Sequence, residues 1–179
     1  MAIAVTLFCT ILFYAIPEKQ ARMEKYTKNQ TDALTHDISS IEEYRNQYLG
    51  DASNTTGLIN SLPLNNISKT FAIDEDTLTV NYQDDTQQIG IEKLQRDLIY
   101  NSIAAMGAIE NLGEIQYTFY DNTYVFSREE VKRICTEYFH QENLSKLLIK
   151  STWEKTVQQE VKNPDFAHQF SAFADSADN

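Results

Sequence analysis

The stretch IEKLQRDLIYNSIAAMGAIENL, residues 91–112, decides the fold, because it carries the strongest helical pattern in the chain. Apolar side chains recur along it at the three- and four-residue spacing of an amphipathic helix. They are Ile91, Leu94, Leu98, Ala105, Ile109 and Leu112. This spacing predicts one long helix over residues 91–112, which Gly113 ends.

In the sequence, one pair of strands is predicted before this helix and a second pair after it. Residues 70–73 and 77–82 flank a short acidic turn, and the second segment alternates apolar with polar residues, as a half-buried strand does. Residues 114–120 and 123–126 form the second pair, joined at a tight turn. Two hairpins on one side of a crossing helix predict an α+β fold with a small antiparallel sheet.

Capping signals predict four further helices. The signals are the capping boxes Ser40–Glu43 and Ser127–Glu130 and the N-cap residues Asn54 and Asn143. The helices that they begin cover residues 40–49, 55–62, 127–139 and 144–162.

A second apolar stretch, AIAVTLFCTILFYAI at residues 2–16, is followed by Pro17 and charged residues. A membrane core needs about 20 apolar residues, with a lower limit near 17, so this run is slightly short. Neither a basic flank nor a small-residue cleavage site accompanies it, which disfavours a signal peptide. We expect a transmembrane or signal-anchor helix over residues 1–17, inserted in the lipid bilayer. A cleaved signal and a buried helix are the alternatives.

These patterns divide the 179 residues into four parts. They are the membrane segment 1–17, a polar stalk 18–37, a soluble α+β domain 38–163 and a C-terminal tail 164–179. The expected architecture is an N-terminal transmembrane helix followed by a small antiparallel sheet of two hairpins, packed against several helices.

The charges that flank the membrane segment conflict with an outer location for the domain. Basic residues follow the segment at Lys19, Arg22, Lys25 and Lys28, and none precedes it. The positive-inside rule then places the domain in the cytoplasm. A start inside a longer reading frame would remove the conflict, because an upstream region would then set the orientation.

The acidic composition excludes one class of partner. The chain has 15 Lys and Arg against 26 Asp and Glu, a formal net charge of −11. Binding of nucleic acid needs clustered cations that neutralise phosphates. We therefore expect no nucleic-acid partner.

The sequence contains no catalytic or metal-binding signature. The histidines His36, His140 and His168 lack metal-ligand spacing, and each is expected at the surface or at a helix cap. The acidic group at residues 74–76 lacks the glycine and oxygen ligands of a calcium loop. Cys135 lies among apolar residues of a predicted helix, which is typical of an inert core cysteine. We expect no metal, no cofactor and no enzymatic activity.

The most suggestive polar group is the loop between the first two predicted helices of the domain. Its candidate binding residues are Tyr48, Gly50, Asp51, Ser53 and Asn54. Residues such as Asp51 and Asn54 hydrogen-bond to nearby backbone, so we expect them first to fix the loop and second to face a ligand.

A family resemblance begins in the same loop. The chain carries the pattern Y-x-G-D-x-S-N over residues 48–54, followed by Leu58 and Leu62-Pro63. With this pattern it resembles an uncharacterised bacterial domain-of-unknown-function (DUF) family over residues 48–134. The matching residues further on are Leu78, Val80, Tyr82, Tyr100, Asn101, Ala104 and 124–128. The chain departs from the family pattern at Ala52, where asparagine is expected, and at Thr55-Thr56, which are more polar.

The resemblance implies an extracytoplasmic domain that is anchored in a membrane. Some members are similar to the C-terminal part of BlaR/MecR-type membrane sensors, which implies a role in signal sensing. The family supplies no agreed catalytic residues, so none is assigned to this chain.

We therefore expect a membrane-anchored, non-catalytic extracytoplasmic domain that senses a signal or binds another protein. The expected partners are the lipid bilayer, through residues 2–16, and another membrane protein or a cell-wall fragment. A hydrolase that uses carboxylates such as Asp51 is one alternative function. A structural accessory of a larger membrane protein is the other.

Overall fold

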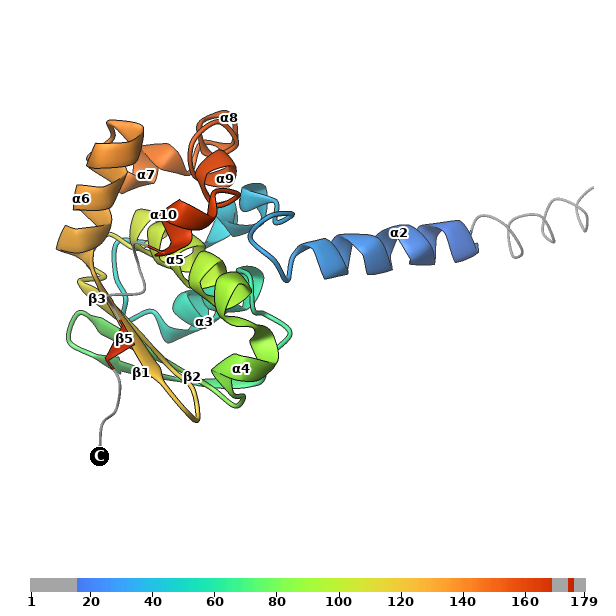
Figure 1. The fold of residues 1–179 in the computed structure, drawn as a ribbon, viewed down its shortest axis with the longest axis horizontal. Helices are drawn as coiled ribbons and strands as arrows, with labels where there is room; N and C mark the ends of the chain where they lie inside the picture. The colour runs from blue at the N-terminus through green and yellow to red at the C-terminus, as the bar shows by residue number, and fades with distance from the viewer. Residues whose placement is uncertain (1–15, 169–173, 176–179) are drawn as a thin grey trace, which may run out of the picture.

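The computed structural model describes residues 16–168 and 174–175, which form an α+β fold (Figure 1). The sheet lies on one side of the long helix α5 (Ile91–Ala108), and the shorter C-terminal helices lie on the other side. Helix α2 (Ile16–Asn29) projects away from this body, with residues 17–28 exposed.

The sheet contains five strands in the order β1-β2-β3-β4-β5. Their bounds are β1 Lys69–Asp74, β2 Thr77–Tyr82, β3 Glu114–Thr118, β4 Thr123–Ser127 and β5 Ala174–Asp175. Strands β1 and β2 are antiparallel, as are β3 and β4. Strands β2 and β3, however, are parallel neighbours, with Leu78 paired to Ile115.

The prediction of a small antiparallel sheet is therefore wrong, because the two hairpins join in one mixed sheet. The cause is the path of the chain between them. Helix α5 carries the chain from the end of β2 back to the level where β2 began. A helical crossover of this kind places the next strand parallel to the previous one.

The membrane-spanning helix of the predicted architecture also requires correction. Within residues 16–168 and 174–175, no helix is both long enough and apolar enough to cross a bilayer. Helix α2 carries charged side chains along its whole length. The predicted segment 1–17 lies outside the described residues, apart from Ile16 and Pro17, which begin α2.

The remaining helices are mostly short. They are η2 Ile38–Tyr44, α3 Ala52–Ser61, α4 Thr86–Ile89, α6 Arg128–Phe139, α7 Leu144–Leu147, α8 Lys150–Trp153, α9 Val157–Glu160 and α10 Pro164–His168. The Ser127 cap predicted for α6 is confirmed, since the Ser127 hydroxyl accepts from the Glu130 backbone nitrogen at 3.3 Å. The Glu130 carboxylate accepts from the Ser127 hydroxyl at 2.8 Å, not from the Ser127 backbone N–H that a capping box requires.

Two predicted helices take a different form. Residues 38–44 form a 3₁₀ helix capped by Asp37, whose side chain accepts from the Ser39 backbone nitrogen. Ser40, the predicted cap, instead places its hydroxyl 3.2 Å from His36 Nε2. The helix predicted over residues 144–162 is divided into α7, α8 and α9. The breaks at Ile149 and Thr156, where the backbone leaves helical angles, allow Trp153 to turn into the core.

Helix α5 forms the centre of the core, and every residue from Asp97 to Ile109 is buried. The apolar face of the sheet is buried as well, through Leu78, Val80, Tyr82, Ile115, Tyr117, Tyr124 and Phe126. The helix ends at Ala108 rather than at Leu112, because the next residues pair with an earlier segment. The Glu110 backbone nitrogen donates to the Asn46 carbonyl oxygen at 3.1 Å.

Candidate functional site

The predicted binding loop is built around the beginning of α3. Asp51 is the N-cap residue, and its Oδ1 accepts a hydrogen bond from the Asn54 backbone nitrogen at 3.1 Å. Its Oδ2 accepts from Asn46 Nδ2 at 3.1 Å. Asn54 in turn donates to the Tyr44 carbonyl oxygen at 2.7 Å. Asp51 and Asn54 thus fix the loop, although Asp51 and not Asn54 caps the helix.

The other three candidate residues face solvent. The Tyr48 side chain is 65% exposed, and Gly50 and Ser53 are exposed as well. The structure therefore does not bring the five residues to one point. Asp51 and Asn54 form hydrogen bonds within the loop, and Tyr48 points toward solvent. A ligand-binding role for these residues stays a prediction.

Tyr48 lines a hollow of about 450 Å³ beside the C-terminal end of α5. A second hollow of about 660 Å³ adjoins it, and a third of about 480 Å³ adjoins the second. The first and second hollows share Gly107, Glu110 and Ser145, and the second and third share Arg128, Glu129 and Lys132. We call this continuous depression the α5 groove.

Gly107 sets the width of the groove between α5 and α7. A Cβ atom at this position would lie 2.9 Å from the Leu144 carbonyl oxygen and 3.1 Å from Leu148 Cγ. Glycine in the interior of a helix normally weakens it relative to alanine. Here the missing side chain permits the close contact of α7 with α5.

Arg128 joins the end of α5 to the beginning of α6. Its Nε donates to the Leu112 carbonyl oxygen and its Nη2 to the Ile109 carbonyl oxygen, each at 2.6 Å. Partial burial lowers the pKa of the Arg128 guanidinium, and the nearby Glu110 carboxylate opposes this shift. The guanidinium therefore serves mainly to hold the backbone that forms the groove wall.

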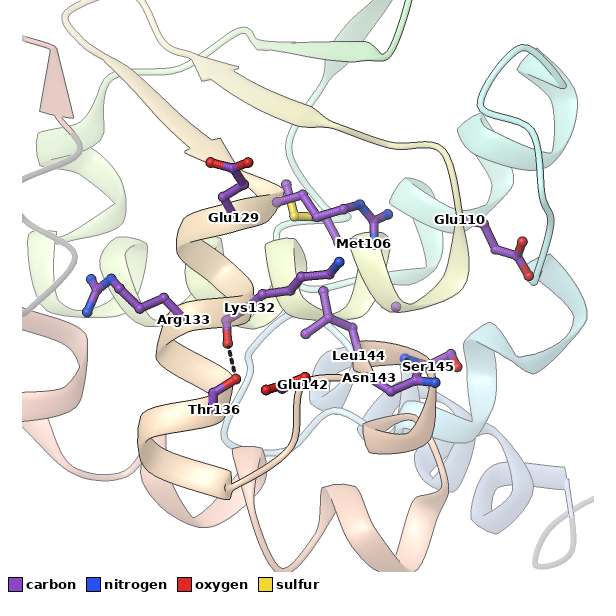
Figure 2. Close-up of a pocket in the computed structure, with 12 residues that line it drawn as sticks. Met106, Glu110, Glu129, Lys132, Arg133, Thr136, Glu142, Asn143, Leu144 and Ser145 are labelled. Carbon is purple, nitrogen blue, oxygen red and sulfur yellow. Dashed lines mark hydrogen bonds between the residues drawn. The ribbon is translucent and has the colours of Figure 1, made fainter.

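Four charged side chains of the second hollow remain available to a ligand. Glu110, Glu129, Lys132 and Glu142 make no side-chain hydrogen bond or ion pair within the described part of the chain. Figure 2 shows the Lys132 side chain reaching into the hollow toward Leu144. The neighbouring Arg133 points away and pairs with Glu137 at 3.3 Å.

Little in the sequence indicates these groove residues. Lys132 belongs to a polar stripe on α6, which also includes Glu129 and Thr136, and such a stripe is normally a solvated helix face. A glycine inside the strong α5 pattern is the one local signal of close approach. Nothing local indicates that α6, α7 and the Tyr48 loop meet around it.

His36 lies in the core, so its predicted place at the surface or at a cap is wrong. Its Nε2 lies 2.7 Å from the Ser61 carbonyl oxygen, which makes Nε2–H the donor. Its Nδ1 then accepts from the Tyr100 hydroxyl at 2.9 Å. Burial lowers the pKa of His36 to about 4, so the ring is neutral near pH 7. His140, by contrast, is the C-cap of α6.

The cysteine and the possible metal ligands of the described chain do not form a reactive site. Cys135 is buried, and burial raises the pKa of its thiol to about 12, which is typical of an inert cysteine. Within residues 16–168 and 174–175, no three His, Cys, Asp or Glu side chains are grouped to hold a metal ion.

Comparison with known proteins places this arrangement in a family. A family model described as a domain of unknown function, DUF4825, matches residues 41–132. No curated protein and no solved structure matches the chain. The match includes the Tyr48 loop, strands β1 to β4, helix α5 and Lys132. It confirms the resemblance to an uncharacterised DUF family, but it does not extend to the motif, to membrane anchoring or to BlaR/MecR sensors. The chain belongs to the DUF4825 family.

Proposed function

We propose that this chain is a non-catalytic binding domain that holds a segment of another protein in the α5 groove. The observation that carries the proposal is the continuity of the groove from Tyr48, at one end, to Lys132. An exposed tyrosine offers a rigid contact area with a polar tip, which suits it to interfaces. The extended form of the depression fits a peptide segment better than it fits a compact small molecule.

The charges of the groove support a partner with charges of its own. Lys132 and Glu142 lack partners in the described chain, and each is exposed. Charged groups placed in this way select a partner by complementary charge and increase its rate of association. A peptide with an acidic side chain for Lys132 and basic side chains for Glu142 and the neighbouring Glu129 satisfies these groups at once.

The positions of the reactive groups support a non-catalytic role. The hydrolase alternative depends on a free carboxylate such as Asp51, but both Asp51 oxygens accept hydrogen bonds that build the loop. A general acid or base needs a carboxyl group within reach of the reacting atoms. These hydrogen bonds give the Asp51 carboxylate a structural role in the loop.

The proposal includes attachment to the lipid bilayer through residues 2–16, with the domain outside the cytoplasm. The apolar sequence of that run supports the attachment, although the flanking charges favour the opposite side. Helix α2 has 14 residues, a length of about 21 Å, and it projects away from the domain. It serves as a spacer, and another membrane protein is then within reach of the groove.

Photo-crosslinking in cells tests the proposal. A photoreactive amino acid replaces Ser145 inside the groove or, as a control, Lys155, which is exposed and outside it. We expect an adduct from position 145 that is sensitive to protease, that weakens in the Tyr48→Ala variant and that does not form from position 155. An adduct removed by a cell-wall hydrolase instead would show that the partner is a cell-wall fragment. Equal adducts from both positions would overturn the proposal.

A further inference from the structure

Strand β1 forms an open edge of the sheet. It pairs with β2 along its whole length, from Lys69 opposite Tyr82 to Asp74 opposite Thr77. Among residues 16–168 and 174–175, no strand pairs with its other side. The opposite edge is partly covered, since β5 pairs with Thr123 and Tyr124 of β4.

The open edge lacks the features that normally prevent strand pairing. Natural edge strands are protected by proline, by a bulge, by central charges or by shortness. The β1 register continues over six residues without a bulge, and its four central residues, Thr70–Ile73, are uncharged and contain no proline. Ile73 is 36% exposed and Ala72 is exposed, so apolar side chains lie directly at this edge.

We infer that β1 pairs antiparallel with β1 of a second copy of this chain, in a register centred on Ala72. This register places Phe71 opposite Ile73 on both sides of the two-fold axis, and both side chains lie on the α5 side of the sheet. It places Thr70 opposite Asp74. Opposed apolar side chains of neighbouring strands stabilise such a pair.

Charge complementarity selects this register over the nearest alternative. Centred on Ala72, it brings Lys69 of each copy to the acidic turn, at Glu75, that follows β1 of the other copy. Within the described chain the Lys69 ammonium donates to Asn60 Oδ1 and to the Asn65 and Ile67 carbonyl oxygens, at 3.5, 3.4 and 3.0 Å, but has no carboxylate partner. A register centred on Phe71 keeps the same faces together but sets Lys69 opposite the apolar Ile73. Partial burial lowers the pKa of Lys69 to about 8, and a carboxylate from a second copy would offset that effect.

The β1 edge is separate from the α5 groove. None of the residues from Lys69 to Asp74 lines any of the three hollows. Pairing through β1 thus leaves the α5 groove of each copy open. The dimer can therefore be tested independently of peptide binding in the groove. The product is a dimer with a continuous sheet and two binding sites.

Cysteine crosslinking of the full chain, in a Cys9→Ser background, tests this inference. At the two-fold axis, the Ala72 Cα atoms of the two copies lie about 4.5–5.5 Å apart, within the disulfide range of about 4.4–6.8 Å. Ala72→Cys is therefore expected to give a disulfide-linked dimer under mild oxidation. Thr70→Cys is the matched control, because its two copies would lie about 14 Å apart.

Two further variants make the test decisive. Coexpressed Thr70→Cys and Asp74→Cys chains are expected to link to each other, because these positions are opposed in the proposed register. Ile73→Lys is expected to abolish the Ala72→Cys dimer while the far-UV circular dichroism spectrum stays that of the wild type, since Ile73 lies at the exposed edge. Equal linkage of Ala72→Cys and Thr70→Cys, or no linkage in a folded chain, would overturn the inference.

Discussion

Asp97 of α5 accepts a hydrogen bond from the Ala33 backbone nitrogen at 2.8 Å, and its side chain is fully buried. Lys93, one turn earlier on α5, pairs with the same carboxylate and also donates to the Thr31 carbonyl oxygen at 2.9 Å. The segment that follows α2 is thereby held on the first half of α5. The other end of α5 lines the groove, so one helix connects the projecting α2 with the proposed binding site.

The Asp97 contact gives a first prediction about stability. Asp97→Ala removes the acceptor of the buried Ala33 N–H. We expect a loss of about 1–3 kcal/mol in the free energy of unfolding, measured by urea titration at pH 5, where Asp97 with its pKa of about 6 is mostly protonated in the folded chain and its charge does not enter the comparison. Glu43→Gln, at an exposed carboxylate, is the control and should change stability by less than about 0.5 kcal/mol. Equal effects of the two variants would show that the Asp97 contact does not anchor the segment.

His36 gives a prediction about pH. Its pKa falls from 6.5 to about 4 on folding, so between these values the unfolded chain binds a proton that the folded chain does not. The free energy of unfolding therefore decreases as the pH falls from 6.5 to 4, by roughly 3 kcal/mol from this group. Below pH 4 this contribution no longer changes.

Asp97 acts in the opposite direction, so the His36 effect must be isolated. Burial raises the pKa of Asp97 to about 6, and the folded chain then binds the extra proton between 3.8 and 6. The difference in unfolding free energy between wild type and His36→Gln cancels the Asp97 contribution. We expect this difference to shrink as the pH falls from 6.5 to 4 in urea titrations. A constant difference would contradict the buried, neutral state of His36.

Gly107 gives a prediction that runs against helix propensity. Alanine in the middle of a helix normally stabilises it, but Gly107→Ala would bring Cβ to 2.9 Å from the Leu144 carbonyl oxygen. We expect a loss of about 1–3 kcal/mol, because α7 must move away from α5. Gly50→Ala is the matched control, since no atom lies within 4 Å of its added Cβ. A gain in stability for Gly107→Ala, measured by thermal unfolding, would show that α7 does not pack closely here.

Single strands and helix caps could be predicted from the sequence. The contacts between elements distant in the sequence could not. Alternation within residues 77–82 and the Ser127 cap depend on neighbouring residues, and both predictions are confirmed. The parallel pairing of Leu78 with Ile115 depends on a crossover through α5. The early end of α5 depends on Asn46, which is distant in sequence.

The same distinction holds for the candidate site. The backbone hydrogen bonds of Asp51 and Asn54 are local, so their role in fixing the loop could be inferred. The α5 groove combines the Tyr48 loop with α5, α6 and α7, and no single window of sequence contains it. Close contact at Gly107 becomes visible only when α7 is placed against α5.

The most direct test of a binding role for the α5 groove is amine labelling of two lysines, in cells and in the purified protein. Lys132 lies in the groove and Lys155 lies outside it, and both are exposed. Mass spectrometry gives the ratio of their labelling by a membrane-permeant amine reagent. We expect a lower Lys132-to-Lys155 ratio in cells than in the purified protein, because a partner covers Lys132. The same ratio in both preparations would contradict it.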